Sequence, residues 1–373
     1  MDMRQTDKWI CRLFCVFLAA MPLLFWLLPK TDYAAREKRY LAAAPALNTE
    51  NLFSGRFAEE AEAYAADHLP GRDFLVGLNA VFELASGRQG THTVWLGRNG
   101  RLLEAPVIWD EEKLARDMAA IRSFAERAGQ PVDLMLVPSA GSVLPEDLPA
   151  LAEPYRDAEI LDAVRADAGD GLRFVPLLPL FQAAENREAL YYRTDHHWTA
   201  EGAYCAAARY LDTVGREGPP RGQYRIITEE GFRGSTWSRA ALWFLPAEPI
   251  ELWDSGREFR VEIREQEGEH AGLFYREHLA EDDKYPVYLD GNHSLVRVRS
   301  TDPAAQGKIL VIRDSFANCF GCFLADAYEE VVLVDLRYYR SPVSELLDEG
   351  FDQILILYSI GNFMSDANIV RLE

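Results

Sequence analysis

The stretch Lys308-Ile309-Leu310-Val311-Ile312-Arg313-Asp314-Ser315-Phe316 sets the expected fold of this chain. It is a short apolar run that leads directly into a serine, and a stretch compatible with a helix follows. Proteins with parallel sheets place reactive serines there, at the carboxyl end of a strand with a helix N-terminus beneath. The stretch therefore predicts an α/β fold with Ser315 at the edge of the sheet. An Asp-Ser pair after a strand is also a common helix cap, so this motif alone leaves both interpretations open.

Four further runs of the same kind support a parallel sheet. They are nearly continuous in apolar residues, as strands buried on both faces are, and they are Val132–Val137, Leu172–Leu177, Val331–Leu336 and Gln353–Tyr358. Helical patterns fill the gaps: Asp110 is expected to cap one helix and Gly129 to end it, and Ser341 with Pro342 is expected to begin another. The β-α-β order predicts right-handed crossovers.

Residues 218–300 interrupt this order. Glu258–Arg264 and Ser294–Arg299 alternate apolar and polar residues, which is typical of half-solvated antiparallel strands. We therefore expect a β-rich insertion before the strand that carries the serine. Six aromatic residues of the insertion are able to stack on sugar rings, but we expect them to form its own core: Trp237, Trp243, Trp253, Tyr275, Tyr285 and Tyr288.

A second stretch, Tyr191-Tyr192-Arg193-Thr194-Asp195-His196-His197-Trp198-Thr199, carries the groups that a reactive serine needs. An Asp two residues before a His turns back in a loop and accepts the imidazole Nδ1–H, which leaves Nε2 free as a base. Adjacent side chains diverge in extended backbone, so the spacing favours His197 over His196. We expect Ser315 as the nucleophile, His197 as the base and Asp195 as its orienter. Two partly buried, hydrogen-bonded histidines are the alternative interpretation.

The aromatic neighbours of the histidine pair are expected to support it. Trp198 and Tyr192 would pack around the His197 ring and limit its rotamers, and Thr199 would cap the helix that follows.

Both stretches resemble a known family. Asp195-His196-His197-Trp198-Thr199 and the later Asp314-Ser315-Phe316 resemble the DHHW proteins, which are relatives of the periplasmic SGNH-hydrolase-like acetyltransferases that modify alginate. Tyr64–Asp73 is similar to the family's early Tyr-x-x-Asp-x-Phe-Pro-x-Arg-Asp segment, and Val334–Tyr339 is similar to the segment after the serine helix. The resemblance covers most of the chain from about residue 55. It departs at Arg313, where many SGNH proteins have glycine.

The resemblance implies an SGNH/flavodoxin-like three-layer fold with a parallel sheet. It also implies an O-acyltransferase, expected to carry acetyl, that acts on a cell-surface polysaccharide and receives the acyl group from a multi-pass membrane acyltransferase. It assigns the base to the second histidine and supporting roles to His196 and Trp198. Asn362, in Ser359-Ile360-Gly361-Asn362, is implied as an oxyanion donor, but the family's Gly block is missing near Arg337. No cofactor and no metal ion are expected.

The same residues are compatible with other functions. Water in place of a sugar as the acceptor would make the protein an esterase. Asp195-His196-His197 also matches the letters of the metal-binding DHH phosphoesterases, but the aspartate clusters that these enzymes need do not stand out before residue 190. Arg313 and the missing Gly block favour a third alternative, a non-catalytic glycan-binding or scaffold protein on an SGNH frame.

Charge and hydropathy patterning restrict the compartment. The net charge of −20 argues against binding of nucleic acid or of anionic lipid, whose phosphates would repel it. Leu13–Pro29 is a run without charge that follows Arg4, Lys8 and Arg12, and with the residues just before it the run reaches the ~20 residues that a membrane span needs. We expect an uncleaved single-pass anchor, Trp9–Leu28, with the body outside the cytoplasmic membrane. A cleaved signal peptide is the alternative, and basic residues after the span weaken the signal for orientation.

These patterns divide the chain into three parts: a membrane anchor at 1–30, a linker at 31–55, and an SGNH-like α/β domain at 56–373 with its insertion at about 218–300. Two amphipathic helices over 57–68 and 74–84, and a hairpin with Asn99-Gly100 at its turn, are expected before the sheet.

Two of the five cysteines, Cys319 and Cys322, form a C-x-x-C just after Ser315. We expect them to pack a helix against the sheet; a disulfide is the alternative outside the cytoplasm.

Overall fold

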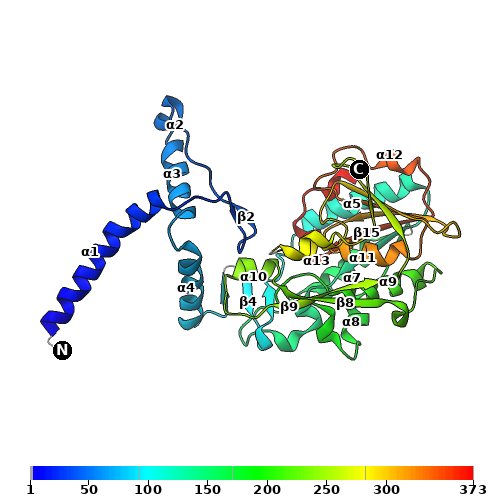
Figure 1. Cartoon of the computed structure of the whole chain (residues 1–373). Coiled ribbons are helices and arrows are strands. Elements are labelled where there is room, and N and C mark those ends of the chain that lie inside the picture. Colours follow the sequence, from blue (N-terminus) through cyan, green and yellow to red (C-terminus); the bar gives the residue numbers. More distant parts are fainter. Residues whose placement is uncertain (1–2, 92, 170, 282, 373) are drawn as a thin grey trace. The chain divides into compact units, whose positions relative to one another are not determined.

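The computed structural model describes residues 3–91, 93–169, 171–281 and 283–372 (Figure 1). The chain divides into two compact units. The first consists of Met1–Arg88 with Ala241–Trp243, and the second of Gln89–Ala240 with Phe244–Glu373. The second unit begins at Gln89, and the domain bounds given from the sequence stay a prediction. The two predicted amphipathic helices form, but they belong to the first unit.

The first unit contains helices and one small hairpin. Its elements are α1 (Met3–Leu27), β1 (Tyr33–Ala34), β2 (Arg39–Tyr40), α2 (Thr49–Ser54), α3 (Arg56–Asp67) and α4 (Arg72–Ala85). The segment predicted as a linker thus carries a hairpin and a helix. Asp67, at the end of α3, explains the hairpin's position, because its Oδ2 accepts hydrogen bonds from Arg39 Nη1 at 2.9 Å and from the Ala42 N–H at 2.8 Å.

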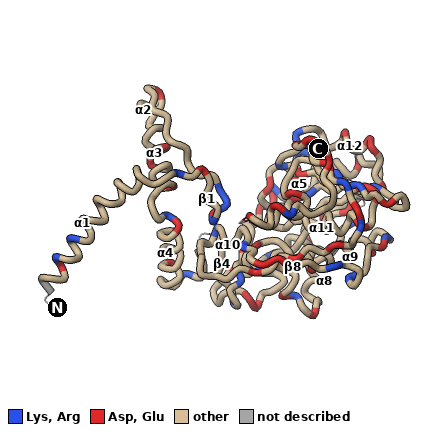
Figure 2. Tube along the Cα trace, in the orientation of Figure 1, with Lys and Arg blue, Asp and Glu red and all other residues tan. Residues whose placement is uncertain are grey.

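Among the described residues, one helix is long and apolar enough to cross a membrane. It spans Gln5–Leu27, and its most apolar 18-residue window has a mean hydropathy of 2.2 and is not buried within the protein. Arg12 is the last charged residue of this helix, whereas charged residues are interspersed along the rest of the chain (Figure 2). The predicted apolar N-terminal helix is therefore confirmed. A signal sequence near the N-terminus passes the same test of length and apolar composition.

An eight-stranded mixed sheet forms the centre of the second unit (Figure 1). Five of its strands are parallel, as predicted, and lie in the order β14 (Glu330–Val334), β13 (Lys308–Arg313), β15 (Gln353–Ser359), β6 (Val132–Val137) and β7 (Leu172–Phe174). The central strands are buried almost throughout, which is why their sequences are continuously apolar. β7 ends before Pro176, which has no N–H with which to extend the ladder.

Helices cover both faces of this sheet. β13 lies between β14 and β15, so the connection from β13 to β14 and the connection from β14 to β15 run across the sheet in opposite directions. Right-handed crossovers therefore place the helices of these two connections on opposite faces of the sheet. α5 (Glu111–Ala128) contacts α7 (Asp157–Asp167) and α12 (Ser344–Leu347), whereas α9 (Ala200–Thr213) contacts α11 (Ala317–Ala325). The predicted three-layer α/β fold is confirmed.

Helix ends were predicted with mixed success. Asp110 caps α5 by accepting the Lys113 N–H, Gly129 ends that helix in the left-handed region, and Thr199 caps α9. The prediction that Ser341 begins a helix is wrong. α12 begins three residues later, and Ser341 Oγ accepts a hydrogen bond from Arg264 Nη2 at 3.4 Å.

The β-rich insertion is present in two parts. β10 (Phe259–Ile263), β11 (Glu269–Ala271) and β12 (Leu295–Ser300) extend the main sheet beside β14 as antiparallel strands. β10 alternates buried and exposed residues, as its sequence predicts. β8 (Arg225–Phe232) and β9 (Glu248–Asp254) form a separate antiparallel ribbon. The remaining strands and helices are short: β3 (Gly90–Thr91), β4 (Val94–Leu96), β5 (Leu102–Glu104), α6 (Ala140–Val143), α8 (Leu178–Gln182), α10 (Ser235–Ala240) and α13 (Ile360–Ser365).

All five cysteines, each of them in the described part of the chain, are free thiols. Cys319 and Cys322 are buried on α11 within the hydrophobic core, as expected for residues that pack this helix against the sheet.

The predicted hairpin of β4 and β5 places a buried arginine against the histidine stretch. Asn99 and Gly100 take positive φ at its turn. Arg101 follows and is 2% exposed. Its Nε donates to Asp147 Oδ2 at 2.8 Å, and its Nη1 donates to the carbonyl oxygens of Tyr191 at 3.0 Å and Tyr192 at 2.9 Å. One guanidinium group thus fixes the backbone that enters the histidine loop.

We expect Arg101→Met to destabilise the protein by about 3–5 kcal/mol, because it leaves the Asp147 carboxylate buried without its cation. Chemical denaturation of the full-length chain in detergent measures this change. Arg98→Met, on the same hairpin but exposed, is the matched control and should lie within about 0.5 kcal/mol of wild type. Equal unfolding midpoints for the two variants would refute the role given to Arg101.

Candidate active site

Ser315 lies at the carboxyl edge of the sheet, between the end of β13 and the start of α11. It is 7% exposed. Its backbone N–H donates to no group among the described residues, whereas the N–H groups of Asp314, Phe316 and Ala317 are all engaged. The serine therefore stands at the predicted position with a free backbone donor beside its hydroxyl.

The carboxylate of Asp314 fixes the turn that carries Ser315. Asp314 is completely buried. Its Oδ1 accepts the Phe316 N–H at 3.0 Å. Its Oδ2 accepts the Ser359 N–H, the Ser359 hydroxyl and the Asn362 side-chain amide, each at 2.8 Å. Four donors to one buried carboxylate tie the end of β13 to the end of β15.

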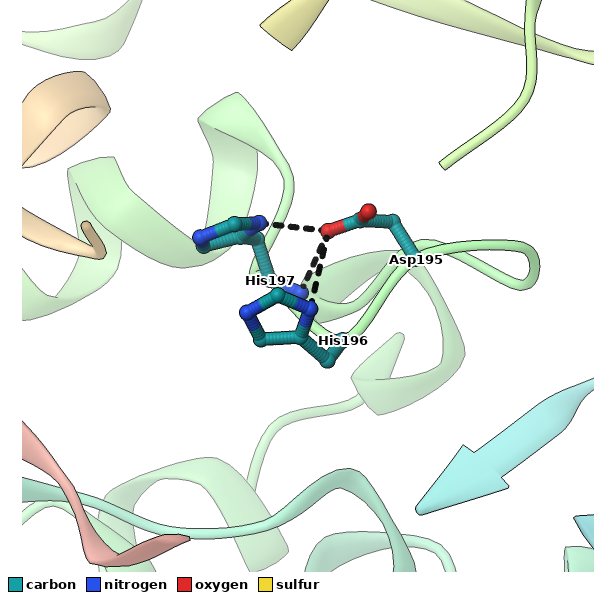
Figure 3. Close-up of side chains that lie close together, drawn as sticks. All are labelled: Asp195, His196 and His197. Atoms are coloured by element: carbon teal, nitrogen blue, oxygen red, sulfur yellow. Dashed lines mark hydrogen bonds and ion pairs between the residues drawn. The ribbon is translucent and has the colours of Figure 1, made fainter. Parts of the chain in front are cut away.

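The histidine loop brings Asp195, His197 and Ser315 into line. Asp195 Oδ1 lies 2.5 Å from His197 Nδ1 and also accepts the His197 backbone N–H at 2.9 Å (Figure 3). His197 Nε2 lies 2.7 Å from Ser315 Oγ. A carboxylate is only an acceptor, so Nδ1 carries a proton in this arrangement, and in the neutral ring Nε2 accepts the serine O–H. Asp195 and His197 are 3% and 6% exposed, which excludes most water from the chain of hydrogen bonds.

The insertion holds the second oxygen of Asp195. The Ser235 N–H donates to Asp195 Oδ2 at 2.5 Å, from the start of α10. The preceding Gly234 packs so closely that a Cβ there would lie 2.1 Å from Asp195 Cβ and 2.2 Å from Oδ2. Neither residue was predicted from the sequence, because a backbone N–H donor and a glycine that leaves space for a neighbouring side chain belong to no recognisable sequence motif.

His196 points to a different partner from His197. Its Nδ1 lies 2.7 Å from Ser235 Oγ and 3.7 Å from Asp195 Oδ1 (Figure 3). Burial lowers the pKa of His196 below its ordinary value, and the neighbouring His197 adds to the shift, so the ring is neutral at neutral pH. One nitrogen each from His196 and His197, with a carboxylate oxygen of Asp195, lie within 4.8 Å of one another, a spacing that a metal ion is able to bridge. The expectation that the site works without a metal stays a prediction.

Three rings surround the His197 imidazole, and they are not the ones predicted. His196 and Tyr285 lie with their centroids 3.9 Å from it, and Phe316 lies at 4.8 Å. Trp198 instead donates from Nε1 to the Phe316 carbonyl at 3.1 Å. This hydrogen bond links the histidine loop to the serine turn. Tyr192 packs on Phe232 of the insertion.

Arg313 is accommodated without opening the serine turn. Its side chain is completely buried, and its Nη1 donates to Asn292 Oδ1 at 3.1 Å and lies 3.8 Å from Asp335 Oδ2. Asn318, on α11, donates to the same Asn292 oxygen at 3.1 Å. Burial lowers the pKa of Arg313, and Asp335 counteracts part of that shift. The insertion therefore supplies one polar partner, Asn292, to the side chain at this position, and Asp335 after β14 supplies the nearest carboxylate.

The predicted oxyanion donors are only partly free. One N–H of the Asn362 side-chain amide donates to Asp314, so only the other N–H is available to an oxyanion. The oxyanion role of Asn362 stays a prediction. Where the family's Gly block is missing, Asp335 is buried and accepts hydrogen bonds from Arg337. The free N–H of Ser315 remains the clearest donor in the described residues.

A small cavity of ≈ 40 Å³ adjoins Asp195 and His196. Its walls contain both apolar and polar side chains and include Leu103, Val107, Val137, Phe316, Glu104, His196 and Ser359. Burial acts to raise the pKa of Glu104, but a protonated His196 and the Arg239 guanidinium, which is hydrogen-bonded to Glu104, act against it and the pKa is lowered.

Comparison with known proteins identifies two related families. Residues 89–240 match the family model of the SGNH hydrolase-like domain of the acetyltransferase AlgX, and residues 177–334 match that of the DHHW proteins. The probable alginate O-acetylase AlgJ of Pseudomonas syringae pv. tomato is 24% identical over 207 residues. This match covers 53% of each chain, so this chain spans about half the length of the curated relatives that it matches.

Solved structures show the same fold. A DHHW family protein from Eubacterium siraeum has a TM-score of 0.64 at 19% identity, over 76% of this chain and 97% of that one. Bacillus cereus PatB1, solved with a sulfonyl adduct, has a TM-score of 0.65 at 18% identity, over 77% and 100%. The predicted relationship to the DHHW proteins and the SGNH-like fold are confirmed.

We expect Gly234→Ala to lower the rate of any reaction at Ser315 by at least about 100-fold, because the new methyl group displaces the Asp195 carboxylate that orients His197. Acylation of the full-length protein by an activated acetyl ester, followed by mass spectrometry, measures the rate. Gly222→Ala is the matched control, since no atom lies within 4 Å of its added Cβ. Wild-type acylation by Gly234→Ala would contradict the importance of this contact.

Proposed function

We propose that this chain, with the SGNH-hydrolase-like fold of the DHHW and AlgX proteins, is an O-acyltransferase that carries an acyl group on Ser315. The observation that carries the proposal is the 2.7 Å contact between His197 Nε2 and Ser315 Oγ, with Asp195 held against Nδ1. A nucleophile, a base and an orienting carboxylate in hydrogen-bond reach form the arrangement that activates serine in acyl transfer. A binding or scaffold protein has no need of this alignment.

In the first half of the reaction, Ser315 Oγ forms a bond to the carbonyl carbon of the acyl donor while its proton passes to His197 Nε2. The tetrahedral intermediate collapses as the bond to the leaving group breaks, and His197 gives its proton to that group. The Ser315 N–H is placed to donate to the oxyanion of the intermediate, and one such donor is worth ~100-fold or more in rate. The product is an ester on Ser315.

In the second half, His197 takes the proton from an acceptor hydroxyl whose oxygen attacks the ester carbonyl. The bond to Ser315 Oγ then breaks, and the serine leaves with the proton from His197. A sugar hydroxyl as the acceptor gives transferase activity and water gives esterase activity with the same residues. The relatives named as alginate O-acetylases favour a polysaccharide acceptor for this chain. The same relatives favour acetyl as the acyl group.

The N-terminal helix suits a membrane-bound role for this enzyme. We propose that residues 1–30 anchor the chain as a single pass and that the α/β body lies outside the cytoplasmic membrane. A multi-pass membrane acyltransferase is then the expected source of the acyl group, because acyl donors of the cytoplasm do not cross the bilayer unaided. The net charge of −20 keeps the body away from anionic headgroups.

We expect incubation of the full-length protein in detergent with an activated acetyl ester to give one acetyl adduct, located on Ser315 by peptide mass spectrometry. Ser315→Ala should not form it. Ser142→Ala, which removes a serine of the short helix α6 that follows strand β6, should label as wild type does. An adduct that persists unchanged in Ser315→Ala would refute the assignment of the nucleophile.

The two histidines should differ sharply in this assay. His197→Ala removes the base and should reduce acyl transfer to below about a thousandth of wild type, whereas His196→Ala removes a neighbour and should retain a measurable fraction. The rate of acyl transfer to a soluble oligosaccharide, or of adduct formation where no acceptor is in hand, distinguishes them. A dead His196→Ala with an active His197→Ala would reverse the assignment.

A further inference from the structure

The imidazole of His197 lies between two other rings. The Tyr285 ring is stacked on it, with centroids 3.9 Å apart and planes inclined by 11°. The His196 ring is also 3.9 Å away, inclined by 35°. Two rings this close and this nearly parallel to a third cannot share one face of it, so they occupy opposite faces. Asp195 and Ser315 bind the two ring nitrogens in the plane, and Phe316 adjoins the edge.

Tyr285 comes from the insertion and not from the parallel-sheet frame. It begins the short 3₁₀ helix η6 (Tyr285–Val287), whose Val287 carbonyl accepts the Tyr275 N–H at 2.8 Å. Tyr288 meets the Tyr285 ring edge-on at 5.4 Å and is itself hydrogen-bonded through its hydroxyl to the Glu251 carbonyl. These contacts fix the Tyr285 ring, which is 6% exposed, without any help from His197.

The phenol of Tyr285 is neutral and has no other task in the described residues. Burial raises the pKa of Tyr285 well above its ordinary value. Its hydroxyl is buried and has no hydrogen-bond partner among the described residues. The side chain is therefore held in place by its ring alone, and the ring faces His197.

We propose that Tyr285 is a positioning residue for His197, and that its π face stabilises the imidazolium that forms when the base takes the Ser315 proton. This inference rests on the proposed function. The face of an aromatic ring is negative, so it attracts a cation that lies over it, and the attraction is strongest where water is excluded. A tyrosine from the insertion thereby acts on the reaction through the base, without touching the reacting atoms.

The stacking makes a specific prediction for the rate and its pH dependence. Tyr285→Leu should slow acylation of Ser315 by roughly 5–30-fold and move the acidic limb of kcat/KM to lower pH by about 0.5–1.5 units, because the protonated ring loses its stabilising face. Tyr285→Phe keeps the ring and should match wild type in both. Replacement of Tyr285 by pentafluorophenylalanine keeps the shape but reverses the charge of the face, and should behave as Tyr285→Leu does even if the leucine variant folds poorly.

A readout that needs no catalysis separates this inference from the proposed function. In the full-length protein labelled with [¹³Cε1]histidine, the His197 resonance is assigned by its loss in His197→Ala. Its titration midpoint should fall in Tyr285→Leu and in the fluorinated variant, and should stay in place in Tyr285→Phe. The matched control is Tyr275→Leu, which removes a stack of the same kind on His270, at 3.9 Å and 20°, from the same insertion. It should change neither the His197 midpoint nor the acylation rate.

Each outcome decides one question. Equal His197 midpoints in wild type and in the fluorinated variant would overturn the role of the π face. A Tyr285→Phe variant as slow as Tyr285→Leu would assign the effect to the hydroxyl and also overturn it. If wild type forms no acetyl adduct while the His197 midpoint moves as expected, the proposed function fails and the stacking stands.

Discussion

The buried carboxylate of Asp314 is the constraint on which the site depends. It accepts four hydrogen bonds from groups that follow two adjacent parallel strands. A buried charge is costly unless it is fully hydrogen-bonded, so the turn after β13 has little freedom to take another shape. That rigidity presents Ser315 with a free backbone N–H beside it. The strand order also matters, because the crossovers after β13 and β14 run in opposite directions, and ligands of α/β proteins bind at such a switch point.

The histidine loop is closed by a β-bridge between Tyr191 and Trp198, and contacts with other parts of the second unit hold it in place. The Arg101 guanidinium binds the carbonyl oxygens that enter the loop. Trp198 anchors its far end to the Phe316 carbonyl. The insertion supplies the Ser235 N–H to Asp195 and the Tyr285 ring to His197. The insertion is thus a structural part of the site, and it also provides one of the partners that let Arg313 replace a small residue before the serine turn.

Sequence reasoning succeeded where a single local rule decides the outcome. Continuous apolar runs predicted β13, β15 and β6, and caps such as Asp110 marked helix ends, because burial on two faces and an unsatisfied N–H each leave a signature in neighbouring residues. Ser341 shows the limit: its sequence suits a cap equally well, but an arginine 77 residues away engages its hydroxyl. The expectation that Trp198 and Tyr192 surround His197 failed for a similar reason, since proximity in sequence does not set which rings meet.

The sequence alone determined the parallel α/β fold, the apolar N-terminal helix and the positions of Asp195, His197 and Ser315 in the order of the chain. These follow from periodicity, from the length of apolar runs and from a two-residue spacing, all of which are local. Only the tertiary structure decided that His197 Nε2 reaches Ser315 across 118 residues, that Gly234 and Ser235 position Asp195, and that Tyr285 stacks on the base. Such contacts depend on how distant backbones are packed against one sheet, and a glycine, a backbone N–H or a tyrosine ring gives no sign in the sequence of what it will face.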